Sequence, residues 1–459
     1  MSADASAPSP VARGRASDLR DMARFAAPIV FINLGVQAMG VVDTLMVGKL
    51  GGAAIAAVAL GNFFVFNVSV FGIGLLCAID PVVAQAVGAG DREGVARGVQ
   101  RGFVLAAIMA VVVTLALLPG ETVLLALGQP ADVVRETAVY TRRRALAVVP
   151  FFAFAVFRQT LQAMGPVRHI LAAVAVANLV NVAANWVLIF GHAGAPALGV
   201  EGAGYATAIS TWVMALLLLA LAWPLLRPAV RPWRRETLHW APVSRMLRIG
   251  VPIGVQWFFE SFAFGLTALF MGWLGTTALA GHEIALNMAA LTFMVPLGIS
   301  GAAAAVVGRA IGRGDMPAAR RDAVAAIVCG VGFMCVSAAV FILAPTWLAT
   351  AYTTEPATVA VAVALIPLAG WFQVFDGLQA VTSGVLRGVG DTRIPAALHL
   401  VAFWGVGIPL GYYLGFHTPL RERGLWMGLV AGLAAAAILQ TLRVIGRLRR
   451  NIGRVMVDH

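Results

Sequence analysis

The chain has 459 residues, of which 60% are hydrophobic and only 12% are charged. Soluble domains carry about 25% charged residues, so the composition excludes an ordinary water-soluble domain and requires solvation by lipid. The net charge of +12 does not indicate nucleic-acid binding, because the cations lie in short clusters between apolar runs, which is typical of the loops of membrane proteins.

Twelve apolar runs are long enough to cross a membrane, since a spanning helix needs about 20 residues. Six lie in the first half of the chain, near residues 23–47, 53–87, 98–119, 137–163, 168–190 and 203–226. Six more follow near residues 245–274, 277–311, 323–345, 357–386, 394–416 and 424–446. The predicted fold class is therefore an all-α integral membrane protein with twelve transmembrane helices.

Polar segments set the predicted domain boundaries. The sequence predicts a disordered cytoplasmic tail, an N-lobe, a cytoplasmic linker, a C-lobe and a basic cytoplasmic tail, over residues 1–20, 21–226, 227–244, 245–446 and 447–459. Each lobe contains six spans.

Two short motifs indicate that the lobes are duplicates. AVGAGD at residues 86–91 returns as AIGRGD at 310–315, and LQAMGPVR at 161–168 returns as LRGVGDTR at 386–393. The two offsets are nearly equal, at 224 and 225 positions. Because each unit has an even number of spans, the copies insert in the same orientation, which predicts two parallel repeats related by an axis along the membrane normal.

The distribution of cations predicts the orientation. With both termini in the cytoplasm, all but seven of the 33 Lys and Arg residues lie on the cytoplasmic side, as the positive-inside rule requires. We therefore expect a multi-pass protein of the bacterial cytoplasmic membrane. The seven exceptions are Lys49, Arg135, Arg142, Arg143, Arg144, Arg421 and Arg423, and the Arg142–Arg144 cluster has no explanation in the sequence.

Acidic residues within the spans are the first candidates for a functional site. Glu260, Asp376 and Asp43 lie inside apolar runs, where a charge costs about 3 kcal/mol and therefore usually marks an ion or proton pathway. Such a carboxylate is relieved by binding a proton or a metal cation. Asp80 and Glu283 are weaker candidates because they lie near helix ends, where water can reach them. The alternative for each residue is a neutral, hydrogen-bonded tie between helices.

Two amides share a helical face in the fifth span. Asn181 and Asn185 are four positions apart, so their side chains point the same way. Amide oxygens suit a hard cation near Asp43, and an interhelical polar clamp explains them as well.

Aromatic, Met and polar side chains gather near the acidic residues of the second half. Flat apolar walls beside a carboxylate suit lipophilic organic cations, through burial and cation–π contact, although core or lipid-facing packing is the alternative for any one residue. The predicted lining of a substrate cavity is Gln256, Trp257, Phe259, Glu283, Met294 and Phe372.

The sequence contains no enzyme signature. Lys49 is the only lysine and lies in no phosphate-binding loop, which excludes a Walker-type ATPase within this chain. The seven histidines and three cysteines show no catalytic or metal-ligand spacing. We therefore expect no enzymatic activity and no cofactor, apart from a coupling ion drawn from a gradient.

Five segments resemble one known family in their residues, order and spacing. They are VDTLMVGKLG at 42–51, NVAANWVLIFGHAGAPALGVEGAGYATAIS at 181–210, VPIGVQWFFE at 251–260, HEIALNMAALTFMVPLGIS at 282–300 and FQVFDGLQAVTSGVLRGVGDTR at 372–393. Over roughly residues 20–445 the chain is similar to the multidrug and toxic compound extrusion family, particularly its NorM-like branch.

The resemblance implies two six-helix lobes that form a V around a central cavity. It also implies antiport of cationic amphipathic drugs against Na⁺ or H⁺. On the matching motifs, Glu260 and Asp376 correspond to the C-lobe cation site, where Na⁺ is one candidate ion. Asp43, Asn181 and Asn185 correspond to a polar N-lobe site.

One residue departs from the family pattern. NorM-like members that bind Na⁺ in the C-lobe commonly have a tyrosine four residues before the acid of the tenth span, and this chain has Phe372 there. The substitution removes an oxygen ligand and counts against Na⁺ at this site.

The expected partners are cationic amphipathic small molecules and the lipid bilayer, with no nucleic acid, and we expect a monomer. The rival function is a lipid-linked precursor flippase of the same superfamily. Such a flippase favours a cationic cavity for pyrophosphate, whereas the candidate residues here are acidic and aromatic.

Overall fold

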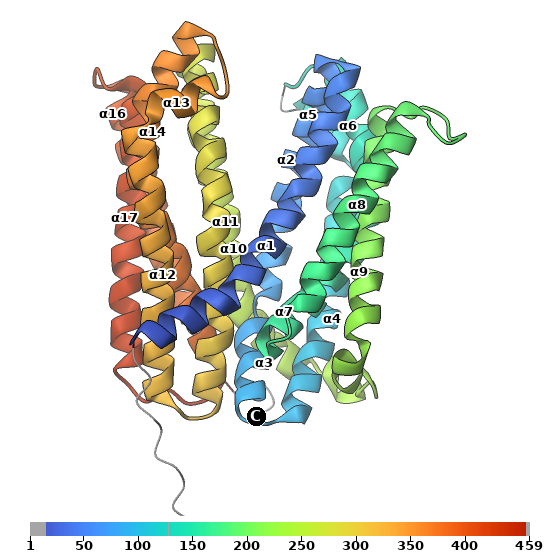
Figure 1. The fold of residues 1–459 in the computed structure, drawn as a ribbon, viewed down its shortest axis with the longest axis vertical. Helices are drawn as coiled ribbons and strands as arrows, with labels where there is room; N and C mark the ends of the chain where they lie inside the picture. The colour runs from blue at the N-terminus through green and yellow to red at the C-terminus, as the bar shows by residue number, and fades with distance from the viewer. Residues whose placement is uncertain (1–14, 127, 456–459) are drawn as a thin grey trace, which may run out of the picture.

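The computed structural model describes residues 15–126 and 128–455, and within them the chain forms helices and connecting loops without a β-strand. Within these described residues, twelve helical segments are long and apolar enough to cross a membrane, which confirms the predicted number of spans. Figure 1 shows that these segments form two bundles, an N-lobe and a C-lobe.

The N-lobe contains the first six spans. They are α1 (Arg15–Val47), α2 (Gly52–Leu76) with α3 (Ile79–Gly88), α4 (Arg92–Leu117), α6 (Ala131–Arg144) with η2 (Ala145–Ala147) and α7 (Val148–Met164), α8 (Arg168–Phe190), and α9 (Val200–Val230). Two short helices, η1 (Gly48–Leu50) and α5 (Gly120–Ala126), lie between spans. The sequence did not predict the break between α2 and α3.

The C-lobe contains the other six. They are α10 (Trp240–Leu274), α11 (Thr276–Gly312), α12 (Met316–Leu343), α14 (Pro356–Val389), α15 (Arg393–Leu400) with η4 (Val401–Gly407) and α16 (Ile408–Phe416), and α17 (Arg421–Leu448). The short helices η3 (Arg235–Leu238) and α13 (Pro345–Thr350) precede α10 and α14. The segment η4 is a π-helix, a form that often marks functional sites.

The ends of the helices shift some predicted boundaries. Because α1 begins at Arg15, the prediction of disorder through residue 20 is wrong for residues 15–20, while residues 1–14 lie outside the described residues. The segment between α9 and α10 is shorter than predicted and covers residues 231–239.

The two lobes form a V. Their helices converge at the end where α1 begins and α17 ends, and they diverge toward the opposite end (Figure 1). We call the convergent end the arginine-rich end, because most of the cationic loops lie there. Helix α1 packs against both α8 of the N-lobe and α11 and α12 of the C-lobe, so it links the two bundles.

The first repeated motif forms the same turn in both lobes. Gly90 and Gly314 adopt φ values of 70° and 74°, a left-handed conformation that favours glycine at a helix end. Asp91 and Asp315 then cap the next helix, accepting hydrogen bonds from backbone N–H groups at 2.7 and 2.9 Å. The motif therefore recurs because each copy stops one helix and starts the next.

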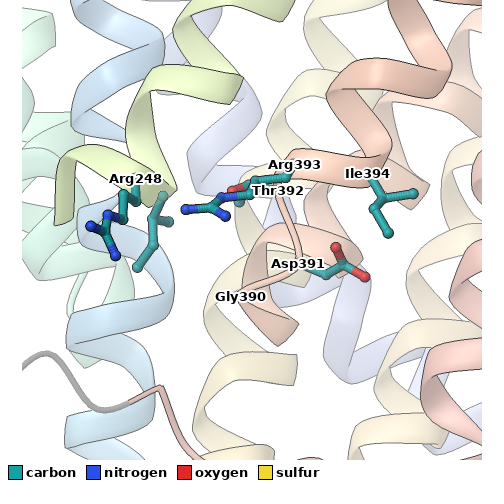
Figure 2. Close-up of a pocket in the computed structure, with 7 residues that line it drawn as sticks. Arg248, Gly390, Asp391, Thr392, Arg393 and Ile394 are labelled. Atoms are coloured by element: carbon teal, nitrogen blue, oxygen red, sulfur yellow. The ribbon is translucent and has the colours of Figure 1, made fainter. Parts of the chain in front are cut away.

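The second repeated motif is also a turn. Gly165 follows α7 and Gly390 follows α14, with φ values of 114° and 83° that glycine adopts without strain. Figure 2 shows the turn from Gly390 to Arg393 that leads into α15. The matching turns confirm the predicted duplication.

The lobes touch backbone to backbone at symmetric positions. A Cβ atom added at Gly88 would collide with the carbonyl of Arg309, and one added at Gly312 would collide with the carbonyl of Gln85. The repeat offset of 224 positions relates these two contacts, so the interface has an approximate two-fold axis. Only glycine allows this close crossing of α3 and α11.

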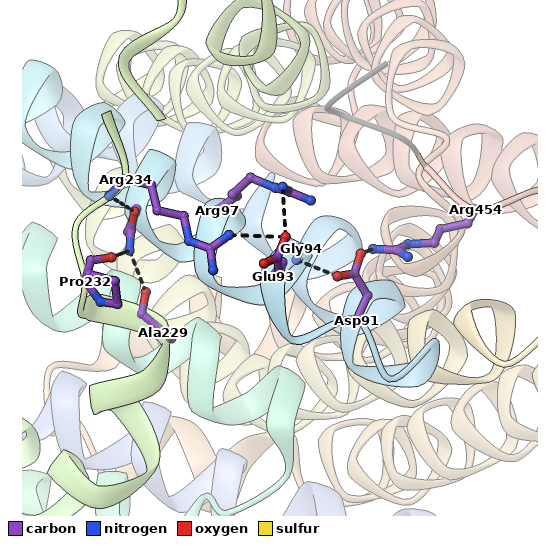
Figure 3. A network of polar contacts seen from close by, with 9 residues as sticks. Asp91, Glu93, Gly94, Arg97, Ala229, Pro232, Arg234 and Arg454 are labelled. Atoms are coloured by element: carbon purple, nitrogen blue, oxygen red, sulfur yellow. Dashed lines mark hydrogen bonds and ion pairs between the residues drawn. The ribbon is translucent and has the colours of Figure 1, made fainter. Parts of the chain in front are cut away.

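The linker after α9 is fixed to the N-lobe by a buried amide. Gln100 donates hydrogen bonds to the carbonyls of Ala229 and Pro232 at 3.2 and 3.0 Å, and it accepts one from the backbone N–H of Arg234 at 3.0 Å. Glu93 lies 3.5 Å from the Arg234 guanidinium (Figure 3). The linker is therefore held against the start of α4.

Candidate functional site

A buried carboxylate in the N-lobe is surrounded by side chains from two other helices. Asp43, near the end of α1, is fully buried. Its Oδ1 accepts hydrogen bonds from Nδ2 of Asn181 at 3.1 Å and from Nδ2 of Asn185 at 2.7 Å, both on α8. Thr207 of α9 donates its hydroxyl to Oδ2. The structure thus brings together the three N-lobe residues predicted from the sequence and adds Thr207.

The side-chain oxygens of the two asparagines accept no hydrogen bond within the part of the chain that the structure describes. The Oδ1 atoms of Asn181 and Asn185 are buried and have no hydrogen-bond partner among the described residues. Leaving each such oxygen buried without a hydrogen bond costs about 1–3 kcal/mol of folding free energy, so binding of a ligand or a water at these atoms is favoured. Oxygen ligands beside Asp43 suit a hard cation, while the direct contacts also clamp α1 to α8. Both interpretations from the sequence fit this geometry.

The arginine cluster that departed from the positive-inside pattern has partners. Arg142 and Arg143 form ion pairs with Glu121 and Glu201, at 2.8 and 2.7 Å. Arg144 binds the hydroxyl of a buried tyrosine one turn earlier in α6, at 2.8 Å. Each arginine of this cluster therefore has a local partner, which explains how three cations can lie on the side of the protein that has few of them.

The two C-lobe carboxylates lie near each other. Glu260 on α10 and Asp376 on α14 are close enough to interact electrostatically. Oε2 of Glu260 lies 3.5 Å from Nε2 of His399 on α15. Gln379 Nε2 lies 3.2 Å from Nδ1 of the same ring, and Nε2 of the ring is buried without a hydrogen-bond partner among the described residues.

Buried amide groups without partners lie one turn from each carboxylate. Gln256 precedes Glu260 by four positions and Gln373 precedes Asp376 by three, so each pair shares a helical face. The Nε2 atoms of both glutamines are buried and have no hydrogen-bond acceptor among the described residues. The oxygen of Gln373 accepts two hydroxyl groups, at 2.9 and 2.7 Å. Free donors beside two carboxylates indicate a polar site that takes up a ligand or water.

The aromatic residues divide into two environments. Phe372 is 2% exposed and packs edge-on against Phe264 and Trp426, so it belongs to the interior of the C-lobe. Phe259 is partly exposed and meets Trp404 edge-on, with ring centroids 5.8 Å apart. Phe259 can therefore contact a ligand in the described conformation, whereas Phe372 shapes the site from behind.

The remaining predicted cavity residues lie on α10 and α11. Glu283 is exposed, and Met294 and Trp257 are half-buried. The Trp257 ring lies 5.9 Å from the Arg387 guanidinium, toward the arginine-rich end. These three side chains make no hydrogen bond or ion pair with Glu260 or Asp376.

A buried ion pair joins the lobes at the arginine-rich end. Asp80 of α3 lies 3.7 Å from Nε of Arg387 on α14, and the two side chains are 11% and 7% exposed. Arg158 adds a second favourable electrostatic interaction with Asp80, and Ser300 accepts a hydrogen bond from Arg387 at 3.2 Å. The suggestion from the sequence that water solvates Asp80 is wrong, because α3 packs against α11 and α14.

Two symmetric hydrogen bonds reinforce this contact. Gln85 of the N-lobe donates to the carbonyl of Gly388 at 2.8 Å, and Arg309 of the C-lobe donates to the carbonyl of Ala163 at 2.9 Å. The repeat relates the donors to each other and the acceptors to each other. The convergent end is therefore closed by polar contacts that must break for the lobes to separate there.

The segment after α17 crosses the junction of the lobes. Arg454 Nη2 lies 2.6 Å from Asp91 Oδ2 (Figure 3), and the backbone N–H of Val455 donates to Gln85 at 2.7 Å. Because α17 belongs to the C-lobe and both acceptors belong to the N-lobe, residues 449–455 form a strap between them. The prediction of a basic tail did not include this contact.

The Arg454–Asp91 contact depends on an ionised carboxylate. Partial burial raises the pKa of Asp91, but the backbone hydrogen bond from Gly94 and the Arg454 guanidinium outweigh it, so the pKa lies below its ordinary value of 3.8. The contact therefore stabilises the strap at pH above 3.8 and is lost as the pH falls through the lowered pKa.

Loss of the strap should loosen the convergent end. In a variant lacking Cys329 and Cys335, the buried Cys77 at the α2–α3 break reports access to this junction. We expect Arg454→Ala to speed thiol labelling of Cys77 by up to about fivefold, because a partly exposed ion pair contributes up to about 1 kcal/mol. A chain ending at Leu448 should label faster still. Unchanged labelling in both variants would contradict the strap, and Arg450→Ala is the matched control.

Four residues of the site were not found from the sequence. Thr207, His399 and Gln373 have no local signal, since each becomes informative only through a partner on another helix. Arg387 was counted only as a loop cation, although its place in the repeated motif LRGVGDTR marks it as part of the lobe junction.

Comparisons with known proteins agree with the fold and extend it. The family model described as MatE matches residues 28–187 and 252–413. The probable multidrug resistance protein NorM of Mesorhizobium japonicum is 37% identical over 444 residues, covering 94% of each chain. The multidrug resistance protein NorM of Burkholderia vietnamiensis is 39% identical, covering 92% of this chain and 93% of its own. A crystal structure of the eukaryotic MATE transporter AtDTX14 superposes with a TM-score of 0.89 at 23% identity, covering 97% of this chain and all of the other.

Proposed function

The chain belongs to the MatE family of membrane transporters, and from this premise we propose that it exports cationic amphipathic compounds by cation-coupled antiport. The observation that carries the proposal is the C-lobe cluster. Two acidic side chains, Glu260 and Asp376, lie close together among buried amide donors and beside aromatic rings. Such a cluster attracts an organic cation and also attracts a small competing cation.

The proposed coupling ion at the C-lobe is the proton. His399 presents a ring nitrogen 3.5 Å from Glu260, so a proton can be shared between a carboxyl group and an imidazole. Phe372 stands where a tyrosine oxygen would assist Na⁺, and the side chain is buried among other rings. A polar N-lobe site around Asp43 offers a second place for a cation.

The proposed cycle links cargo and proton by competition. The cargo cation binds when Glu260 and Asp376 are anionic, and protons from outside neutralise them and weaken cargo binding. This reciprocal coupling converts the ion gradient into export. At 100 mV one charge moved inward supplies about 2.3 kcal/mol, enough for roughly a fiftyfold gradient of cargo if exchange is tightly coupled.

The proposed orientation places the arginine-rich end in the cytoplasm of a bacterium, with both termini inside, in accord with the positive-inside rule. The V then opens outward, and the polar contacts of Asp80, Gln85 and Arg309 close the inner side. We also propose a monomer without enzymatic activity. A flippase for anionic lipid-linked sugars is the rival, and the acidic C-lobe cluster argues against it.

Proteoliposomes can test the coupling ion. We expect an imposed proton gradient to drive efflux of ethidium or norfloxacin, because the Glu260–His399 pair takes up a proton. We expect a Na⁺ gradient alone to drive at most about a tenth of that rate. His399→Gln should shift the pH at which efflux is half-maximal. Equal efflux with Na⁺ alone at constant pH would contradict proton coupling.

A further inference from the structure

A cavity at the arginine-rich end lies apart from both carboxylate sites. Its volume is about 260 Å³, and it is lined by Arg248 and Ile249 of α10 and by the turn from Gly390 to Ile394 that leads into α15. Figure 2 shows the guanidinium group of Arg393 extending from this turn toward the Arg248 side of the cavity. Nothing in the proposed transport cycle uses these side chains.

The cavity carries uncompensated positive charge. Arg248 and Arg393 are exposed, and neither forms an ion pair with a carboxylate within residues 15–126 and 128–455. The acidic residue of the lining, Asp391, is already bound by Arg443 and Arg447 at 2.8 and 3.2 Å. Its charge is therefore neutralised on the side away from the two arginines, and an anion entering the cavity meets two free guanidinium groups.

A threonine hydroxyl and a helix start add hydrogen-bond donors. Thr392 is 6% exposed and lines the cavity, and its hydroxyl makes no hydrogen bond with the other described residues. Helix α15 begins at Arg393, so the backbone N–H groups of Arg393 and Ile394 have no partner within the helix, whereas Pro395 has no N–H and Ala396 donates to the carbonyl of Thr392. Together with the two arginines, these donors form a site for a tetrahedral oxyanion.

The cavity lies at the level of lipid headgroups. Helix α10 has 35 residues, and Arg248 lies about 39 Å along it from the far end at Leu274, at about 1.5 Å per residue. The hydrocarbon core of a membrane is only about 30 Å thick. The length of α10 therefore allows Arg248 to lie beyond the hydrocarbon, at the level where the phosphate groups of lipids are found, while Ile249 and Ile394 supply an apolar side to the cavity.

We propose that this cavity binds a phosphate group, and that its natural source is the headgroup of an anionic phospholipid at the arginine-rich face. Arg248 and Arg393 supply the charge, and the hydroxyl of Thr392 and the start of α15 supply hydrogen bonds. A free phosphate ion shares this chemistry but not the apolar contacts. The inference does not depend on the transported cargo or on the coupling ion.

Native mass spectrometry of the purified, delipidated full chain tests the site. Phosphatidylglycerol is titrated into the wild type, Arg248→Gln/Arg393→Gln and the control Arg449→Gln/Arg450→Gln, which removes two exposed arginines of the same face. We expect about twenty-fivefold weaker binding in the first double variant, about fivefold for each arginine, and no change in the control. Thr392→Val should weaken binding by a smaller factor without changing the charge.

A parallel titration with inorganic phosphate distinguishes the two sources. Binding of phosphatidylglycerol that depends on the two arginines and resists competition by inorganic phosphate supports the lipid. Binding of inorganic phosphate that depends on the same arginines and displaces the lipid keeps the phosphate site but overturns the lipid as its source. Equal binding of both ligands to the wild type and Arg248→Gln/Arg393→Gln overturns the proposal.

Discussion

Replacing Glu260 with Gln, or Asp376 with Asn, is expected to reduce gradient-driven efflux to the background of protein-free liposomes. Each variant removes one of two neighbouring carboxylates that we propose attract the cargo cation and take up the coupling ion. Neither carboxylate has an arginine or lysine partner in the described residues. Removing such a charge leaves no opposite charge unpaired, so the thermal stability should stay the same or rise. Efflux of ethidium and the melting temperature in detergent check both parts.

Two further measurements separate a transport defect from a folding defect. Asp132→Asn removes an exposed acid at the start of α6 and should leave efflux unchanged. Binding of ethidium to each purified variant should depend less on pH, because one of the two carboxylates proposed to exchange cargo for protons is gone. Undiminished gradient-driven efflux in both Glu260→Gln and Asp376→Asn would refute the assignment of the C-lobe site.

The sequence predicted those features that depend on local pattern. Hydropathy identified every span, because a run of about twenty mostly apolar residues is long enough to cross the hydrocarbon core as a helix. The repeated motifs predicted the duplication, because a turn that stops one helix and caps the next needs glycine and aspartate at fixed places. The buried acids Asp43, Glu260 and Asp376 were visible because charge within an apolar run is costly.

The rest of the site depends on contacts between distant helices. In the sequence, His399 has no acidic or metal-binding residue near it, and only the packing of α15 on α10 brings it to Glu260. The strap after α17 reads as a basic tail, because sequence alone cannot show that Arg454 meets Asp91 in the other lobe. The prediction that water reaches Asp80 was wrong for the same reason. The residue lies near a helix end of the N-lobe, but the C-lobe packs over that end and buries it.

The duplication makes one difference between the lobes informative. At the positions equivalent to Asp80 and Arg387, the opposite lobe has Ala304 and Gln162. The buried ion pair therefore exists once, although the glycine crossings and the carbonyl hydrogen bonds around it occur twice. The fold tolerates a neutral pair at this place, so the charges serve the contact between lobes and not the packing of either lobe.

Arg387→Gln is accordingly expected to destabilise the protein by about 3 kcal/mol, because it leaves the buried carboxylate of Asp80 with only the weaker support of Arg158. Asp80→Ala/Arg387→Gln, which copies the opposite lobe, should recover part of that loss, since both charges of the pair are then gone and only Arg158 loses a favourable interaction. Unfolding in sodium dodecyl sulfate measures both effects as a double-mutant cycle.

The double variant should nevertheless behave differently from the wild type. The ion pair joins the lobes only while the arginine-rich end is closed, so removing both charges takes stabilisation away from this conformation alone. We expect spin labels placed across that end to show a larger population of separated lobes, with faster thiol labelling of Cys77. If the double variant is as unstable as Arg387→Gln, the two charges do not act as a pair. If it is stable but its lobes stay closed, the remaining symmetric hydrogen bonds and the strap are sufficient to close this end.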